Sequence, residues 1–93
     1  MGHARADLPL TRQQLTALQF IADYQREHGY PPSLDELRKP LRLAHRSSVH
    51  AHLVALMEKG MIDWIIGAPR TLEITTRGRS ELRRRNVAAQ VRS

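Results

Sequence analysis

The stretch RSSVHAH, residues 46–52, places two hydroxyls and two imidazoles where an apolar helix is about to begin. Hydroxyl and imidazole groups both donate and accept hydrogen bonds, so side chains of these types can bind the exposed edges of DNA bases. Apolar residues that recur at helical spacing along the same segment must turn inward, which leaves the small polar residues facing outward. The outward set, and hence the predicted base-reading set, is Ser47, Ser48, His50 and Ala51.

The same stretch offers little for catalysis or for a metal ion. His50 and His52 are separated by about 200° around a helix, so they do not easily share one ion. The chain has no cysteine to complete a zinc shell. The serines have no His/Asp arrangement that would activate a nucleophile. We therefore expect no metal, no cofactor and no enzymatic activity, and we assign His52 to the edge of the core.

Two capping boxes predict the first two helices. Thr11 begins the sequence TRQQ and Ser33 begins SLDE, and in each pattern a Gln or Glu follows three residues after the cap. The first helix is expected over about residues 12–28. The second helix is expected to be short, because Pro40 lacks a backbone donor and clashes with the preceding turn. It should end near Lys39 or kink there.

The third helix is expected to begin between Arg46 and Ser48 and to end at Gly60. After it, the apolar period changes from about 3.6 to 2 residues, which is typical of β-strands. This alternation runs through MIDWII, residues 61–66, and through TLEIT, residues 71–75. The four residues between them, GAPR, have turn chemistry. The pattern predicts a β-hairpin.

Basic charge is concentrated after this hairpin. The chain has a net charge of +6, and residues 76–93 contribute six arginines against Glu81 alone. Such a segment either binds a polyanion, most often nucleic acid, or serves as a solvated end. We expect a basic helix from about Arg79, after a flexible leader over residues 1–9 and a folded domain over residues 10–75. The sparse apolar residues of this basic helix are the candidates for dimerisation: Leu82, Val87 and Val91.

Three helices followed by a two-stranded hairpin, in a mainly α-helical chain, is the order of a winged helix-turn-helix domain. In such domains the second helix of the helix-turn-helix enters the major groove of DNA, and the hairpin forms the wing. The linked segments LTRQQLTALQFI, HGYPPSLDEL, LAHRSSVHAHLVALMEKGMI and APRTLEI resemble the DNA-binding domain of LexA-type SOS repressors. The resemblance covers about residues 10–75. It implies operator DNA as the ligand and transcriptional repression as the output.

The resemblance also implies roles for single residues. The base-reading positions of the family fall on the same four residues of the third helix, and its wing contact falls near Arg70. Arg46, beside the recognition helix, is expected to bind a phosphate or a guanine, the alternative being a solvated surface arginine. The expected backbone and groove contacts are His45, Arg46, Lys59, Arg70, Arg77 and Arg79.

The chain also departs from this family. Only eighteen residues follow the hairpin, so we do not expect the Ser-Lys self-cleaving domain that dimerises LexA-type repressors. Arg42 stands where the family usually has glycine, in the turn before the third helix. The segment TTRGRSELRRR resembles instead the terminal helix of MarR-like winged-helix regulators, which often joins two subunits.

The predicted function is sequence-specific binding of double-stranded DNA by a transcriptional regulator, a repressor that acts as a homodimer on an inverted-repeat operator. One alternative is a protein-interaction module that modulates another regulator or the transcription machinery. Another is a nonspecific architectural protein that depends on the basic tail. The chain has no apolar run long enough to span a bilayer and no secretory signal. We therefore expect a cytoplasmic, nucleoid-associated protein of a bacterium or a phage.

Overall fold

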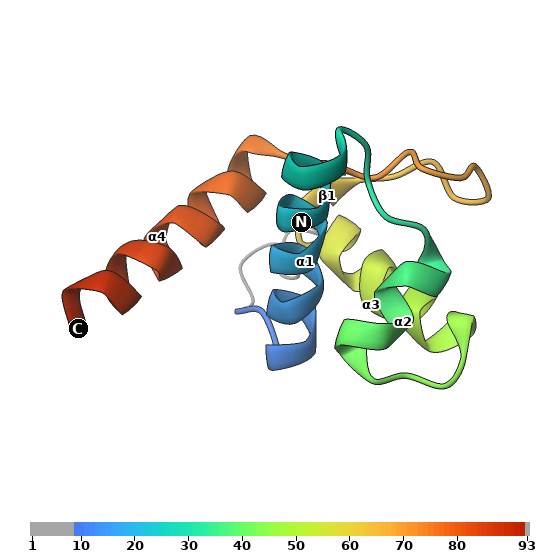
Figure 1. Ribbon diagram of the computed structural model, residues 1–93, viewed down its shortest axis with the longest axis horizontal. Helices are drawn as coiled ribbons and strands as arrows, with labels where there is room; N and C mark the ends of the chain where they lie inside the picture. The colour runs from blue at the N-terminus through green and yellow to red at the C-terminus, as the bar shows by residue number, and fades with distance from the viewer. Residues whose placement is uncertain (1–8, 93) are drawn as a thin grey trace, which may run out of the picture.

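The computed structural model describes the backbone of residues 9–92 and the side chains of residues 9–86. In Figure 1 the first three helices form the body of the molecule, a hairpin extends from one side, and a terminal helix extends from the other. This arrangement confirms the predicted winged helix-turn-helix, mainly α-helical with a small hairpin. In chain order the elements are α1 (Arg12–His28), α2 (Leu34–Leu41), α3 (Arg46–Glu58), β1 (Ile62–Asp63), β2 (Glu73–Ile74) and α4 (Thr76–Arg92).

Both predicted capping boxes are present. The Thr11 side chain accepts a hydrogen bond from the backbone N–H of Gln14, and the Gln14 side chain accepts one from the N–H of Thr11. Ser33 and Glu36 make the same reciprocal pair at the start of α2. Each box satisfies backbone donors that a helix N-terminus leaves open, so α1 and α2 begin where the sequence predicts.

Helix α2 ends at Leu41, two residues beyond Lys39, where Pro40 was expected to end or kink it. Pro40 stays inside the helix, and Arg42 then takes a left-handed conformation with φ 57° and ψ 44°. The N–H groups of Arg42 and Leu43 both donate to the carbonyl of Arg38, which closes the last turn. The closed cap at Arg42, and not the proline, therefore determines where the helix ends.

A single hydrophobic core joins the three helices to the base of the hairpin. Ile62 of β1 and Ile74 of β2 are both buried and close the core below the hairpin. The residues at helical spacing in α3 turn inward as predicted. Side chains with no exposed surface come from all three helices: Ala17, Leu18, Ile21, Leu37, Val49, Leu53 and Leu56.

The hairpin has shorter strands than the alternating sequence predicts. Only Ile62 pairs with Ile74 and Asp63 with Glu73, in an antiparallel register. Beyond them the chain forms a wide turn, in which the N–H of Ala68 donates to the carbonyl of Ile65 at 3.0 Å. A two-stranded ladder without a third strand gains little from further pairing, so the ordered turn replaces it. The hairpin and its turn, residues 62–74, are the wing.

The terminal helix α4 begins at Thr76, three residues before the predicted Arg79. Thr75 caps it: the Thr75 hydroxyl accepts from the N–H of Gly78 at 3.0 Å, and the Thr75 carbonyl accepts from the N–H of Arg79 at 2.9 Å. Gly78 is required here, because a Cβ at this position would overlap the carbonyl oxygen of Met61.

The prediction that Leu82 contributes to a dimer interface is wrong. Its side chain is 8% exposed and belongs to the hydrophobic core, where α4 packs on α1 and β2. The side chains of Val87 and Val91, the other two dimerisation candidates, lie outside the described residues. The backbone of α4 continues to Arg92, and in Figure 1 the helix extends beyond the body of the molecule. None of the helices described within residues 9–92 has the length and apolar character needed to cross a membrane.

Candidate nucleic-acid interface

Helix α3 has one face in the core and one face in solvent. Val49, Leu53 and Leu56 are fully buried. On the opposite side, Ser47 and Ala51 are exposed and stand one helical turn apart. Two more of the predicted base-reading residues, Ser48 and His50, are half-buried at the edges of this face. The four predicted residues therefore form a continuous surface at the N-terminal half of α3.

The N-terminus of α3 is open, unlike those of α1 and α2. Its N-cap residue is His45, and the His45 side chain makes no capping hydrogen bond. The first backbone N–H groups of a helix and the positive end of its dipole attract anions. A phosphate of a DNA backbone can therefore take the position that a side-chain hydroxyl occupies at the other two helices.

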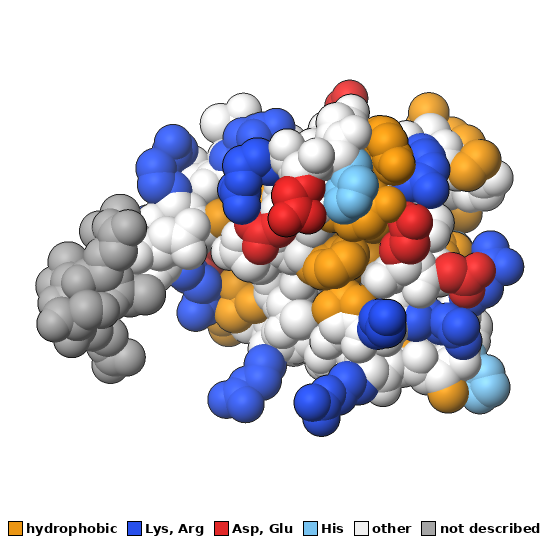
Figure 2. Space-filling view, viewed as in Figure 1, with side chains coloured by type: hydrophobic (Ala, Val, Ile, Leu, Met, Phe, Trp, Pro, Cys, Tyr) orange, Lys and Arg blue, Asp and Glu red, His pale blue; other side chains and the backbone are white. Residues whose placement is uncertain are grey.

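Arg46 stands beside this open end with a side chain that is 64% exposed. Its Nε lies 3.8 Å from Oδ1 of Asp35, whose side chain is also largely exposed. An exposed ion pair of this kind contributes little to stability, so a phosphate or a base can replace the carboxylate at small cost. Figure 2 shows Lys and Arg side chains along the lower edge of the molecule, on the side of α2 and the turn into α3. The surroundings of α3 thus favour an anionic ligand.

The His50 side chain contacts Trp64, a residue of the wing. The ring of Trp64, just after β1, meets the His50 ring edge-on, with centroids 4.9 Å apart and planes at 65°. The two residues lie on different elements, 14 positions apart in the sequence, so local sequence patterns do not predict this contact. The contact covers one side of the imidazole and, at about 0.5–1.5 kcal/mol, favours this orientation of the ring. His50 therefore lies at the edge of the outward face of α3 with its ring against the wing.

The prediction that Lys59 contacts DNA is corrected by the structure. Lys59 is 7% exposed, and its Nζ donates to Oε1 of Gln14 at 2.7 Å and to the carbonyl of Pro9 at 2.9 Å. A buried ammonium needs such acceptors to replace its water shell. Lys59 therefore joins the end of α3 to the start of α1 and cannot reach a phosphate in this conformation.

Arg70, the residue expected to provide the wing contact, lies against the body of the molecule. Its guanidinium contacts Glu36 and the loop before α2. The backbone N–H of Ser33, with the Tyr24 hydroxyl and Arg70, lowers the pKa of Glu36 to about 2. The Glu36 carboxylate in turn raises the pKa of Arg70. Partial burial, together with the hydrogen bond to Glu36, raises the pKa of Tyr24.

The two arginines expected to contact DNA from the tail, Arg77 and Arg79, are exposed near the start of α4. In Figure 1, α4 extends to the left of the body and the wing extends to the right. A duplex that lies across the N-terminus of α3 and the wing would therefore not follow α4 of the same chain. Among the residues that the structure describes, no group of three or more His, Asp or Glu side chains could hold a metal ion.

The chain resembles one family of known proteins over most of this fold. A family model described as the LexA DNA binding domain matches residues 7–71, which include α1, α2, α3 and most of the wing. The LexA repressor of Lactobacillus johnsonii is 38% identical over 74 residues, which cover 80% of this chain and 36% of that protein. The LexA repressor of Bacillus cytotoxicus is 41% identical over 78 residues, covering 84% of this chain and 38% of that protein. The chain thus spans little more than a third of the length of these relatives.

Proposed function

The chain belongs to the LexA DNA-binding domain family, and from this we propose that it binds double-stranded DNA in a sequence-specific way and regulates transcription. One observation carries the proposal. The N-terminal half of α3 exposes Ser47 and Ala51, with Ser48 and His50 at the edges, while the other face of the helix is locked in the core. A helix held in this way can enter a major groove and direct its outer side chains at base edges.

The phosphate contacts of the proposed complex come from the ends of the helix-turn-helix. The open N-terminus of α3 at His45, together with the exposed Arg46, would bind the DNA backbone beside the groove. Arg77 and Arg79 lie on α4, which extends on the side away from the wing (Figure 1), so they would contact only DNA that bends toward α4 beyond the half-site. Backbone contacts of this kind position the protein, and the residues of α3 provide the sequence preference.

The proposed active form is a homodimer on an inverted repeat. One recognition helix reads only about four or five base pairs, too few for useful selectivity in a genome. Because Leu82 is buried in the core, the proposed interface is the part of α4 that extends beyond the body, with Val87 and Val91. Relatives are named repressors, and we propose repression by promoter occlusion, in the cytoplasm and on the nucleoid of a bacterium or a phage-infected cell.

A second candidate function is supported by the apolar turn of the wing. Ile65 is 66% exposed and Ile66 is 53% exposed. Hydrophobic side chains at the surface over the wing are visible in Figure 2. Exposed apolar residues next to one another are typical of protein contacts, so the chain would on this alternative dock on another regulator or on the transcription machinery.

Selection from a library of random duplexes at moderate salt tests the proposed function. Convergence of the bound pool on an inverted repeat is the expected result. A bound pool without a common sequence would support an architectural role, and deletion of residues 79–93 should then abolish binding. If the protein retains no duplex, the proposal fails, and the protein-docking alternative is favoured.

A further inference from the structure

Arg70 is the only Lys or Arg in residues 61–75, the segment that contains the wing. Its Nη1 donates to the carbonyl of Pro31 at 2.8 Å and lies 3.3 Å from Oε1 of Glu36. Its Cζ lies 4.6 Å from the centroid of the Tyr30 ring, within cation–π distance. The only cation of the wing is therefore directed at the loop between α1 and α2, and not away from the molecule.

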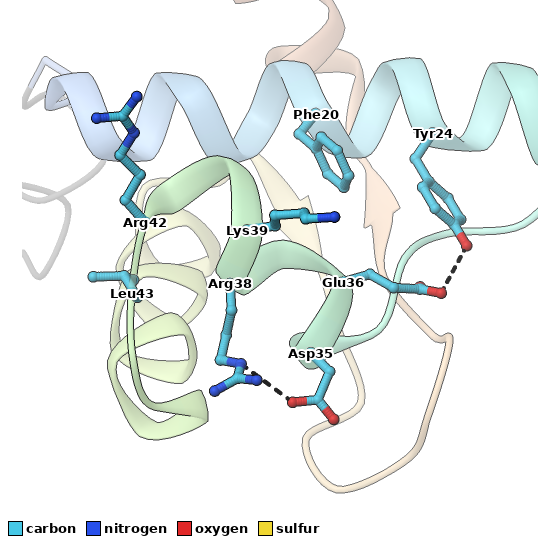
Figure 3. A pocket seen from close by; sticks show the side chains of 8 residues that line it. All are labelled: Phe20, Tyr24, Asp35, Glu36, Arg38, Lys39, Arg42 and Leu43. Carbon is cyan, nitrogen blue, oxygen red and sulfur yellow. Dashed lines mark hydrogen bonds and ion pairs between the residues drawn. The ribbon is translucent and has the colours of Figure 1, made fainter.

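The acceptor for Arg70 is itself held in place from two other sides. Oε1 of Glu36 accepts from the backbone N–H of Ser33 at 2.7 Å, in the capping box of α2. Oε2 accepts from the hydroxyl of Tyr24 at 2.9 Å, which reaches across from α1, as Figure 3 shows. The carboxylate is thus held to α1 and α2 by contacts that do not involve Arg70, and it can serve as an anchor for the wing.

The backbone of Arg70 supports the same conclusion. Its φ is 57°, a left-handed conformation that non-glycine residues keep only where surrounding contacts hold it. The preceding turn is also ordered, because the Thr71 hydroxyl oxygen accepts from the N–H of Ile65, and its one proton lies within reach of two acceptors, the carbonyls of Ile65 and Ala68. These contacts join the two sides of the turn, so the attachment at Arg70 bears on the position of the whole turn.

The wing also contacts the recognition helix, at the edge-on pair of Trp64 and His50. It is therefore attached at two places, to α3 through Trp64 and to the α1–α2 corner through Arg70. We propose that Arg70 is a positioning residue: by binding Glu36 and the Pro31 carbonyl it fixes the wing beside α3, and its guanidinium makes no phosphate contact of its own. The role in DNA binding rests on the function proposed above, whereas the role in placing the wing does not.

The position of the wing is measured first without DNA. Trp64 is the only tryptophan of the chain, so its fluorescence reports on the wing and on its contact with His50 of α3. Arg70→Met and Glu36→Gln should both increase quenching of Trp64 by acrylamide, and glutamine preserves the capping box. Arg79→Met, a change at an exposed arginine of α4, is the matched control and should leave quenching unchanged. Unchanged quenching in both wing variants would overturn the proposal, whether or not the protein binds DNA.

Binding to the duplex that the wild type selects gives the second measurement. Arg70→Met should weaken binding about tenfold, equivalent to about 1.4 kcal/mol, without changing the slope of log K against log salt. Loss of a phosphate contact would lower the magnitude of that slope by about 0.9, the result expected for the control Arg46→Met. Because Arg70 acts through Glu36, adding Glu36→Gln to Arg70→Met should cause no further loss.

Each outcome separates this inference from the proposed function. A reduced slope for Arg70→Met would make Arg70 a phosphate contact, and unchanged affinity would show that the attachment does not matter for binding; either result overturns the inference. If the wild type selects no duplex, the proposed function fails, and the fluorescence comparison alone decides the role of Arg70. If Arg70→Met does not fold, the quenching and the duplex binding are both measured on Glu36→Gln instead. Far-UV circular dichroism then confirms that Glu36→Gln is folded.

Discussion

Replacing Arg42 with glycine should stabilise the domain, although the change removes a charged side chain and adds backbone freedom. Arg42 closes α2 with φ 57° and ψ 44°. In this left-handed region the Cβ of an L-residue crowds the following carbonyl oxygen, at a cost of about 1–2 kcal/mol. Within residues 9–86 the Arg42 guanidinium forms no hydrogen bond or ion pair, so little is lost with the side chain.

Glycine relieves the crowding but has more freedom in the unfolded chain, which offsets about 0.4–1 kcal/mol of the gain. The expected net stabilisation is about 0.5–1 kcal/mol. In a domain of this size it corresponds to a rise in Tm of about 2–8 °C. Thermal unfolding followed by circular dichroism measures this shift. Arg42→Ala is the matched control, because it removes the same side chain, keeps the strained φ and should melt close to the wild type.

The comparison between the two variants decides the result. If Arg42→Gly melts at or below Arg42→Ala, the left-handed backbone has no measurable cost, and the account of how α2 ends is refuted. An equal gain in both variants would place the cost in the charge of Arg42 beside Arg38 and Lys39. Arg42→Asn should fall between the two, since asparagine tolerates the left-handed region better than alanine does.

Three further changes test other contacts. Gly78→Ala should lower the free energy of unfolding in urea by about 1–3 kcal/mol, because the new Cβ overlaps the Met61 carbonyl oxygen; Ser80→Ala is the control. Lys59→Met should cost about 1.5–3 kcal/mol through two lost hydrogen bonds, and should leave the salt dependence of DNA binding unchanged. The stability that Glu36 adds over Glu36→Gln should be complete above pH 4.5 and should disappear as the pH falls toward 2, since folding lowers the pKa of Glu36 from 4.5 to about 2. A difference independent of pH would show that the charge of Glu36 is not involved.

Local signals in the sequence were sufficient for most of the fold. The capping boxes at Thr11 and Ser33 depend on residues three apart, so the starts of α1 and α2 could be predicted. The inward face of α3 follows from apolar spacing alone, and it leaves Ser47, Ser48, His50 and Ala51 on the outward side. The start of α4 was missed because Thr75 was assigned to a strand, although its hydroxyl caps the helix.

The residues that surround the candidate site could not be predicted in the same way. Lys59 finds its acceptor Gln14 at a separation of 45 residues, and Arg70 finds Glu36 at a separation of 34. Nothing in the local sequence of either cation distinguishes an inward from an outward direction. Both cations were expected to contact DNA, Arg70 because the family's wing contact falls near it. Only the packing of α1 against the ends of α2 and α3 reveals the internal acceptors.

The central claim is that the N-terminal turns of α3 read the DNA sequence. Parallel selections from one random duplex library, with the wild type and with the double variant Ser48→Ala/His50→Ala, test it most directly. We predict that the wild type selects an inverted repeat. The variant should keep the same salt dependence but lose preference at a few adjacent base pairs in each half-site. Selection of the same motif with the same strength by both proteins would contradict the claim and place the reading surface elsewhere on the molecule.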